Sequence, residues 1–514
     1  MRTLLIMPPY PITEFPTIPM GMAYVAAALR QKGKEAQIED FLVGQYSKEK
    51  LQRRIEEYQP DIVGITSVTL NYPAASAILK DVKDINDNIV TIFGGPHVTF
   101  SVNETLAEAP WIDIIARGES DYTLVDITNG IPLNEIQGIA FKNNGEVTIT
   151  PTRPWLENLD ELAEPARDLF PVSKYRALGN ECGLISSRGC PFGCSFCVGH
   201  KMVGRRGRFR DPKLVVDEIE NILELGFKTV NIVDDLLTVN KEHVYAICAE
   251  MMARKLNIGW TAFSRVDTVS KDLLATMKEA GCFFILYGVE SGNQEILNKA
   301  HKKITPQKTV EAVELAREAG IRTLASFIIG LPGETKETLA ETVSFAKSLN
   351  THYGFHLLSP FPGTEVRERA QEWGLRILTN DWSKYDANEA IVETDGASAD
   401  DLMNIDCQYK EDVDRYIARI EELQKEGKDP DYEGIHIKDQ KRNSIAAILL
   451  QSDIIENLGT LENESDSIHH LAGELADYIP YSPDDIEPAV KEMIAEGLLT
   501  HETSPKGVVW NWAH

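Results

Sequence analysis

The sequence has no apolar run that approaches the ~20 residues a membrane span requires. Its seven cysteines are too few for a disulfide scaffold in a chain of 514 residues. Positive charge is also scarce, since 52 Lys and Arg stand against 79 Asp and Glu, a formal net charge of −27. Such a surface repels phosphate backbones and anionic headgroups. These shortages predict a cytoplasmic protein without a membrane span and without a nucleic-acid partner.

Short β-branched runs alternate with amphipathic helical stretches over the first part of the chain. Residues 3–7 predict a first buried strand rather than a signal peptide. The predicted strands are 3–7, 36–41, 61–67, 89–93 and 112–116, and the predicted helices are 21–32, 48–58, 74–86 and 102–109. This alternation is typical of a doubly wound, Rossmann-like α/β domain, whose ligands bind beyond the carboxyl ends of its parallel strands.

A proline-containing stretch, 149–182, predicts a linker, after which the alternation restarts on a larger scale. The predicted strands lie near 184–187, 229–233, 259–264, 283–289, 322–329 and 354–358. Six such repeats predict a partial (β/α)6 TIM-like barrel with its site at the carboxyl ends of the strands.

The pattern changes again after about residue 385. A charged helix is predicted over 400–427, then three helices near 443–458, 467–478 and 483–496, and two β runs at 498–502 and 507–512. Three helices followed by a hairpin resemble a winged helix, but the last helix is acidic, the wrong charge for a DNA groove. The predicted domains are therefore 1–148, the linker 149–182, 183–385, and an α-rich, winged-helix-like domain, 386–514, that binds protein or only packs.

Three cysteines with the spacing C-x3-C-x2-C are the most informative feature: Cys190, Cys194 and Cys197. Three thiolates on one tight loop can hold three irons of a cubane cluster and leave the fourth iron without a protein ligand. The alternative is a zinc loop completed by His200. The other cysteines in apolar strand or helix patterns are predicted core residues: Cys182, Cys248 and Cys282.

The cysteine loop resembles the cluster-binding motif of radical S-adenosylmethionine (SAM) enzymes, in which SAM chelates the open iron of a [4Fe–4S] cluster. An external electron donor reduces the cluster, which cleaves SAM to a 5′-deoxyadenosyl radical. Short polar or glycine-containing segments follow the later predicted strands and also match the family. Each segment taken alone is equally typical of a helix cap, a turn or a surface carboxylate. Their order at the ends of successive strands favours a SAM-binding site. The resemblance implies these SAM contacts: Phe196, Asp234, Asp235, Ser264, Arg265, Glu290, Ser291, Gly330 and Pro332.

A doubly wound sheet before such a barrel resembles the cobalamin-dependent radical SAM family. The implied cobalamin contacts are Pro9, Tyr10, Met20, Gly21, Thr66, Ser67, Thr69, Leu70, Asn71, Gly94, Gly95, His97, Arg117, Gly118 and Glu119. The Asp-x-His-x-x-Gly string, whose His ligates cobalt in many corrinoid proteins, does not occur. The resemblance implies that the loop Leu70–Tyr72 approaches the lower face of cobalt instead. The alternative is a degenerate sheet that binds no corrin.

One basic run follows the cysteine loop: Arg205, Arg206, Arg208 and Arg210. It is predicted either to stabilise the cluster side or to form ion pairs with the acidic helix after it, at Asp217, Glu218 and Glu220. His352 and His356 are four apart, but their segment is predicted as strand and loop rather than a metal-binding helix.

The resemblance implies an anaerobic C-methyltransferase that uses a [4Fe–4S] cluster, SAM and methylcobalamin to methylate an unactivated carbon. A protein or peptide substrate is the leading interpretation, with a glutamine of methyl-coenzyme M reductase as one target. No side chain is assigned as a catalytic acid or base. The alternatives are a cyclase or rearranging enzyme acting on a tetrapyrrole or lipid with the same cofactors, and a cofactor-binding sensor that does not methylate.

Overall fold

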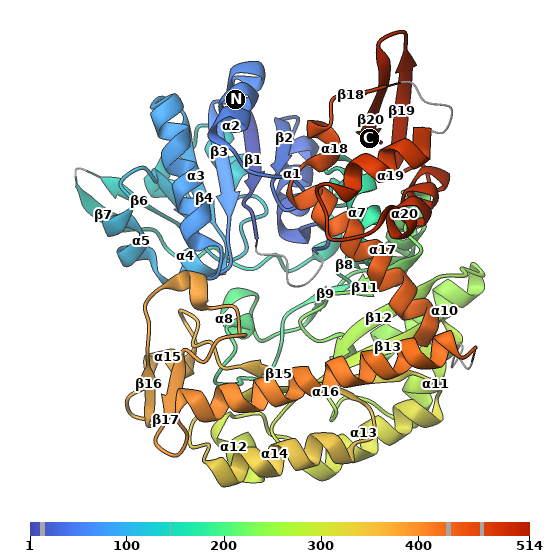
Figure 1. Ribbon diagram of the computed structural model, residues 1–514. Helices are drawn as coiled ribbons and strands as arrows, with labels where there is room; N and C mark the ends of the chain where they lie inside the picture. The colour runs from blue at the N-terminus through green and yellow to red at the C-terminus, as the bar shows by residue number, and fades with distance from the viewer. Residues whose placement is uncertain (11–15, 144, 428–432, 463–466, 514) are drawn as a thin grey trace.

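The computed structural model describes residues 1–10, 16–143, 145–427, 433–462 and 467–513 (Figure 1). The first unit is a seven-stranded sheet in the order β2-β1-β3-β4-β5-β6-β7. Its strands are β1 (Arg2–Met7), β2 (Glu35–Asp40), β3 (Ile62–Thr66), β4 (Val90–Gly94), β5 (Ile114–Ala116), β6 (Ile139–Asn143) and β7 (Glu146–Ile149). Strands β1 to β5 are parallel.

Helices cover both faces of this sheet because its strands are apolar on both sides. They are α1 (Met20–Gln31), α2 (Lys48–Tyr58), α3 (Tyr72–Ile85), α4 (Pro96–Phe100), α5 (Val102–Glu108) and α6 (Thr123–Thr128). Leu4 and Ile6 pack in the cluster under α2 and α3, whereas Leu5 packs with α1 and α6 residues on the opposite face. Strand order reverses between β1 and β3, which puts the ligand-binding crevice of such a fold at their carboxyl ends.

The hairpin β6–β7 is antiparallel to β5 and was not predicted. Its strands follow the 3-10 turn Leu133–Glu135, with Gly138 in a left-handed conformation at φ 77°. Short and half-exposed, they lack the long apolar runs that marked the parallel strands.

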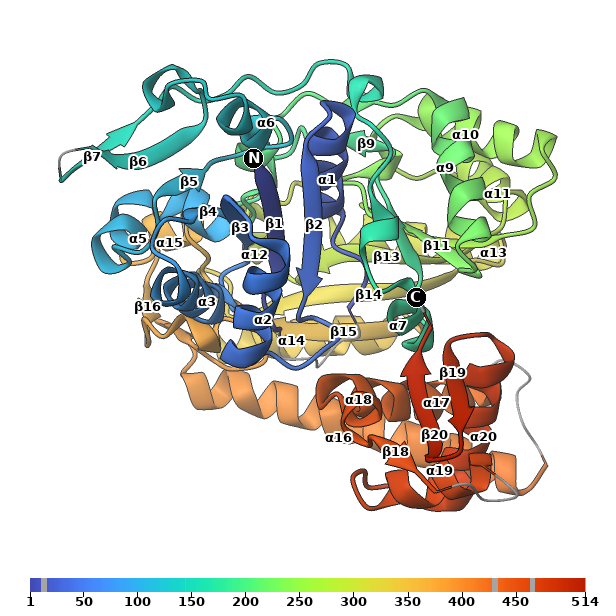
Figure 2. The ribbon, with the colours of Figure 1, turned by 90° about the horizontal axis from the view of Figure 1, so that it is seen from above.

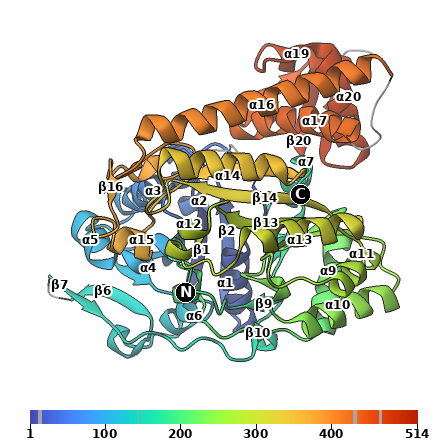
Figure 3. The same ribbon diagram turned by 90° about the horizontal axis from the view of Figure 1, so that it is seen from below.

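The second unit is a six-stranded, wholly parallel sheet in the order β15-β14-β13-β12-β11-β8. Its strands are β8 (Cys182–Leu184), β11 (Thr229–Ile232), β12 (Gly259–Ser264), β13 (Cys282–Glu290), β14 (Arg322–Ile329) and β15 (His352–Leu357). The helices between them are α9 (Pro212–Glu224), α10 (Lys241–Ala253), α11 (Lys271–Glu279), α12 (Gln294–Lys299), α13 (Pro306–Glu318) and α14 (Lys336–Ser348). They lie along one side of the sheet (Figure 3).

Burial alternates along β14, with Ala325 and Phe327 buried and Leu324, Ser326 and Ile328 partly exposed. The buried set packs under the helices, and the other set faces the inside of the open barrel. The site is therefore expected at the carboxyl ends and inner face of this sheet.

The segment predicted as a linker carries the short helix α7 (Val172–Ala177). Arg167, which is 2% exposed, donates to Gly183 O at 2.7 Å and pairs with Glu218 at 2.5 Å, tying the segment to the barrel. Cys182, Cys248 and Cys282 are buried, as predicted.

A long helix, α16 (Ala399–Lys425), runs beside β15, where Tyr409 donates to Tyr353 O at 2.8 Å. It leads to α17 (Glu433–Gln451), α18 (Ile454–Asn457), α19 (Ser467–Ala476), α20 (Pro483–Ala495) and the small sheet β18 (Thr460–Leu461), β20 (Gly507–Trp512) and β19 (Leu499–Ser504). This last unit lies at one corner of the molecule beside α7 (Figure 2), where Arg442 donates to Ala177 O at 2.9 Å.

No helix among the described residues is both long and apolar enough to cross a membrane.

Candidate active site between the two sheets

The cysteine loop joins β9 (Ser187–Arg188) to the short helix α8 (Gly199–Met202), just after the first barrel strand. Cys190 and Cys194 are partly buried and Cys197 is exposed. The loop is held by backbone hydrogen bonds from Cys190 N to Gly204 O at 3.1 Å and from Ser195 N to Ala300 O at 3.0 Å. Neither bond uses a thiol, and although Cys197 Sγ accepts from Gly199 N at 3.2 Å, a thiolate sulfur keeps further lone pairs for an iron.

The donor set fits a cubane cluster. Among the described residues, no three His, Cys, Asp or Glu side chains converge on a point where they could hold a single metal ion. A cubane does not require such convergence, because each thiolate binds a different iron. Burial raises the pKa of Cys190 and Cys194, while the charges of Lys302 and Arg265 oppose the rise at both thiols. Thiolates in this loop therefore need nearby positive charge, which the cluster irons supply when bound.

Asp234, after β11, supports the start of the cysteine loop. Its carboxylate accepts from Ser186 N at 2.6 Å, Ser187 N at 3.0 Å and both serine hydroxyls at 2.6 Å. Neighbouring Asp235 is exposed and accepts from Gly189 N at 2.9 Å. Asp234 thus has a supporting role within the protein, and direct contact of either residue with SAM remains a prediction.

Arg265, after β12, lies against the cysteine loop. Its guanidinium is 3.7 Å from the centroid of the Phe192 ring and 3.9 Å from Cys194 Sγ. It pairs with Asp267 at 2.8 Å and donates to Lys302 O at 2.7 Å. Ser264 beside it contacts Thr238 Oγ1 at 2.6 Å. Arg265, one of the predicted SAM contacts, is therefore close to the loop but already engaged with other groups.

Glu290 ends β13 and forms a buried ion pair with Lys302 at 2.7 Å. Lys302 was not among the predicted site residues, because it lies in a polar loop after α12 with no motif around it. Its ammonium is also 5.9 Å from the Phe196 ring, the aromatic of the cysteine motif. Ser291 is buried and contacts Thr342 Oγ1 at 3.0 Å.

The loop after β14 contains Gly330, with φ 97°, and buried Pro332. Glu334, which was not among the predicted SAM contacts, is fully buried and accepts from Gly330 N at 2.6 Å and Leu331 N at 3.0 Å. Burial raises its pKa to about 8, although the two backbone hydrogen bonds act in the opposite direction. The buried Glu334 carboxyl therefore fixes the backbone of the loop after β14 through these two hydrogen bonds.

The carboxyl ends of β3 and β4 form the predicted cobalamin cradle. Gly95 has φ 101°, and a Cβ there would lie 2.3 Å from Ser67 O, so only glycine allows the two loops to approach. Ser67 Oγ and His97 Nδ1 are buried without a hydrogen-bond partner among the described residues. Such orphaned polar atoms suit a ligand rich in amides and phosphate, as cobalamin is.

The loop after β3 was predicted to approach the lower face of cobalt. Thr69, Leu70 and Asn71 are buried, and Asn71 Oδ1 accepts from Val68 N at 3.0 Å. Val68, which was not predicted, is 44% exposed at the tip of this loop. The side chain exposed at the tip of this loop is therefore that of Val68, and the hydrogen bond that Asn71 accepts from Val68 N fixes the turn.

The remaining predicted cobalamin residues lie around the same edge. Pro9, Tyr10, Thr66, Gly94, Arg117 and Gly118 are partly exposed, Met20 is buried and Gly21 is exposed. Met20 begins α1 and lies against Gly183 of β8, where a Cβ at Gly183 would be 3.3 Å from Met20 Cγ. This edge of the first sheet is thus next to the first strand of the barrel.

Glu119 and Asp121 join the two units through buried ion pairs. Arg188, at the start of the cysteine loop, binds Asp121 with two hydrogen bonds of 2.8 and 3.0 Å. Arg208 binds Glu119 through both carboxylate oxygens. The predicted cobalamin contact Glu119 therefore also serves as an interdomain anchor, which places the cysteine loop beside the carboxyl edge of the first sheet.

The basic run was predicted to have two possible roles. The prediction that it forms ion pairs with the acidic helix is mostly wrong. Arg210 does pair with Glu218 at 2.5 Å, but Asp217 and Glu220 pair with Arg254 instead, at 2.6 and 2.8 Å. Arg208 turns toward the first unit because its partner Glu119 lies there, far away in the sequence. Arg205 donates to Pro191 O of the cysteine loop at 3.5 Å, and a role of the run in stabilising the cluster stays a prediction.

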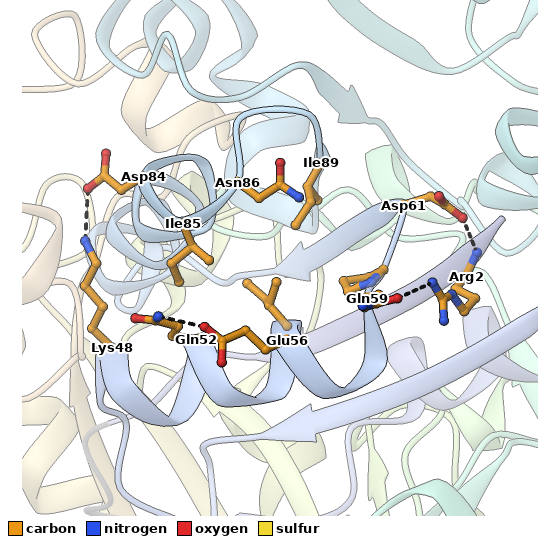
Figure 4. Close-up of a pocket in the computed structure, with 12 residues that line it drawn as sticks. Arg2, Lys48, Gln52, Glu56, Gln59, Asp61, Asp84, Ile85, Asn86 and Ile89 are labelled. Atoms are coloured by element: carbon orange, nitrogen blue, oxygen red, sulfur yellow. Dashed lines mark hydrogen bonds and ion pairs between the residues drawn. The ribbon is translucent and has the colours of Figure 1, made fainter.

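A separate depression lies between α2 and α3, with Arg2, Lys48, Glu56 and Asp84 among its lining residues (Figure 4). Arg2 begins β1, and Pro60 and Asp61, which also line the depression, precede β3. The depression is therefore at the amino edge of the sheet, opposite the cradle.

Two family descriptions match the chain: the Radical SAM superfamily over residues 184–346 and the B12 binding domain over residues 13–128. An uncharacterized methyltransferase, PH0819, of Pyrococcus horikoshii is 37% identical over 76% of this chain and 88% of the relative. The anaerobic magnesium-protoporphyrin IX monomethyl ester cyclase of Cereibacter sphaeroides is 33% identical over 75% of this chain and 66% of the relative.

Among solved structures, the cobalamin-dependent SAM radical enzyme OxsB, with aqua-cobalamin and SAM bound, has the same fold. It aligns with a TM-score of 0.68 at 18% identity, over 96% of this chain and 78% of that chain. The chain belongs to the cobalamin-dependent radical SAM family, methyltransferase subclass. It is an enzyme that uses a [4Fe–4S] cluster, SAM and cobalamin.

Proposed function

We propose that this enzyme methylates an unactivated carbon of a protein or peptide, held between the cysteine loop and the cobalamin cradle. The observation that carries the proposal is the pair of ion pairs Arg188–Asp121 and Arg208–Glu119, which join the cysteine loop to the carboxyl edge of the first sheet. When bound, the cluster with SAM supplies a carbon-centred radical and cobalamin supplies the methyl group.

The chain's own residues hold and position these groups. Cys190, Cys194 and Cys197 are the proposed cluster ligands, and Arg265, Glu290, Ser291 and the loop after β14 surround them at the carboxyl ends of the barrel strands. On the other side, Ser67 and His97 offer polar atoms that have no hydrogen-bond partner within the described part of the chain. The burial of Arg265, Glu290 and Ser291 beside the cysteine loop keeps water away from a reactive intermediate.

The acidic surface and the separate carboxyl-terminal unit support a macromolecular substrate, and a glutamine of methyl-coenzyme M reductase is one target to test. A second candidate is ring formation on a tetrapyrrole without methyl addition. It is favoured by the 33% identity to the cyclase, a relative about as similar as the methyltransferase.

The test is anaerobic reconstitution with iron, sulfide and cobalamin, followed by reaction with SAM that carries a deuterated methyl group. Candidate peptides and a magnesium porphyrin monomethyl ester are supplied in separate reactions, with Cys194→Ala as the control. Equal amounts of deoxyadenosine, S-adenosylhomocysteine and a labelled peptide support the proposal. Deoxyadenosine with an unlabelled, cyclised porphyrin supports the second candidate, and cobalamin binding without SAM cleavage contradicts both.

A further inference from the structure

The ion pair Glu290–Lys302 is built into the barrel rim at some conformational cost. Both side chains are buried, 8% and 7% exposed respectively. Glu290 (φ 71°), His301 (φ 55°) and Lys303 (φ 58°) adopt left-handed backbone conformations that residues other than glycine rarely take. Such strain persists only where the surrounding structure enforces it, which is typical of functional sites.

Strand β13 is irregular where the Glu290–Lys302 ion pair lies. Pairing of β13 with β14 shifts register between Gly288 and Glu290. A Cβ on Gly288 would lie 2.7 Å from Glu290 Oε1 and 2.9 Å from Lys302 Nζ. Any side chain at position 288 would therefore displace both charges.

The loop that carries Lys302 is also fixed to the cysteine loop. Ser195, between two of the cysteines, donates its N–H to Ala300 O at 3.0 Å, and Arg265 donates to Lys302 O at 2.7 Å. The Lys302 ammonium lies 5.9 Å from the centroid of the Phe196 ring, which stands between Cys194 and Cys197 in the sequence. The positive end of the pair therefore lies beside the cysteine loop.

We propose that Lys302 is a positioning residue of the cluster site, whose buried ammonium both orients Glu290 and raises the reduction potential of the bound cluster. One electron from an external reductant adds one negative charge to the cluster. A fixed positive charge in a buried site stabilises that reduced state, because the interaction is only weakly screened there.

The test is a redox titration of the reconstituted holoprotein, followed by the electron paramagnetic resonance signal of the reduced cluster, without SAM or substrate. Lys302→Met is expected to lower the reduced-to-oxidised ratio at a fixed potential about tenfold, a midpoint shift of about 59 mV in the negative direction. Lys302→Arg is expected to restore most of the ratio. Lys303→Met, which removes the neighbouring exposed lysine, is the matched control and should leave the midpoint unchanged.

Glu290→Gln supplies the opposite arm, because it leaves the ammonium uncompensated and should move the midpoint in the positive direction. A purely structural role predicts lower cluster loading in both variants and no shifts of opposite sign. Unchanged midpoints in fully loaded Lys302→Met and Glu290→Gln proteins would overturn the proposal, as would shifts in the same direction. Neither result depends on whether the enzyme methylates a peptide, since no SAM or substrate is present.

Discussion

The rings of Tyr72 and His97 stack with their centroids 4.1 Å apart and their planes inclined by 26°. Tyr72 begins the helix after β3 and His97 follows β4, so the stack joins the two loops of the cobalamin cradle. His97 also makes an edge contact with Trp382, with the ring centroids 4.9 Å apart and the planes inclined by 77°. Trp382 comes from the segment after the barrel, so one buried imidazole contacts both units of the site.

His97 is expected to make stability fall in mild acid. Burial lowers its pKa to about 3, with the charge of Arg367 acting in the same direction, whereas the unfolded side chain titrates near its usual 6.5. The contribution of the neutral His97 side chain to the free energy of unfolding is therefore present above pH 6.5 and is lost as the pH falls toward 3. Relative to His97→Phe, the wild type should lose about 1.4 kcal/mol of unfolding free energy per pH unit below 6.5.

Thermal melts of both proteins between pH 7 and 5 measure this difference. His356→Phe, at an exposed position on β15, is the control and should follow the wild type. Parallel pH profiles for wild type and His97→Phe would contradict the assignment.

Glu334 should show the opposite pH dependence. Its pKa is raised by burial from 4.5 to about 8, so its contribution is complete below pH 4.5 and is lost as the pH rises through 8. Glu334→Gln mimics the protonated form and should keep its melting temperature over this range while the wild type declines. Glu314→Gln, at an exposed position on α13, is the control, and its melting temperature should decline with that of the wild type. If the melting temperature of Glu334→Gln declines as steeply as that of the wild type, this expectation is refuted.

Asp121→Asn should weaken the junction between the two units. The variant leaves the buried Arg188 guanidinium without its two-point partner, and loss of one member of a buried pair costs about 3–5 kcal/mol. Glu157→Gln breaks the exposed pair with Arg206, 71% and 83% exposed, and should change stability by less than about 1 kcal/mol. Urea unfolding and limited proteolysis between the units compare the two variants, and equal effects would show that the Arg188 pair is not an anchor.

The sequence predicted the strands of both sheets well because their apolar runs are long and separated by amphipathic helices. The hairpin β6–β7 was not predicted because its strands are short and half-exposed. The cysteine loop was found because three ligands are close together in the chain. Lys302 and Trp382 were missed because their roles arise from contacts across the fold: Lys302 meets Glu290 over a shifted register, and Trp382 reaches His97 from 285 positions away.

Anaerobic formation of deoxyadenosine tests the central claim most directly. Wild type and single alanine variants of Cys190, Cys194 and Cys197 are reconstituted under identical conditions, with Cys407→Ala, at an exposed cysteine on α16, as the control. Iron content and deoxyadenosine released from SAM after reduction are then measured. Wild type and Cys407→Ala should release deoxyadenosine and the three loop variants none above background, whereas release at the wild-type rate by any loop variant would contradict the account.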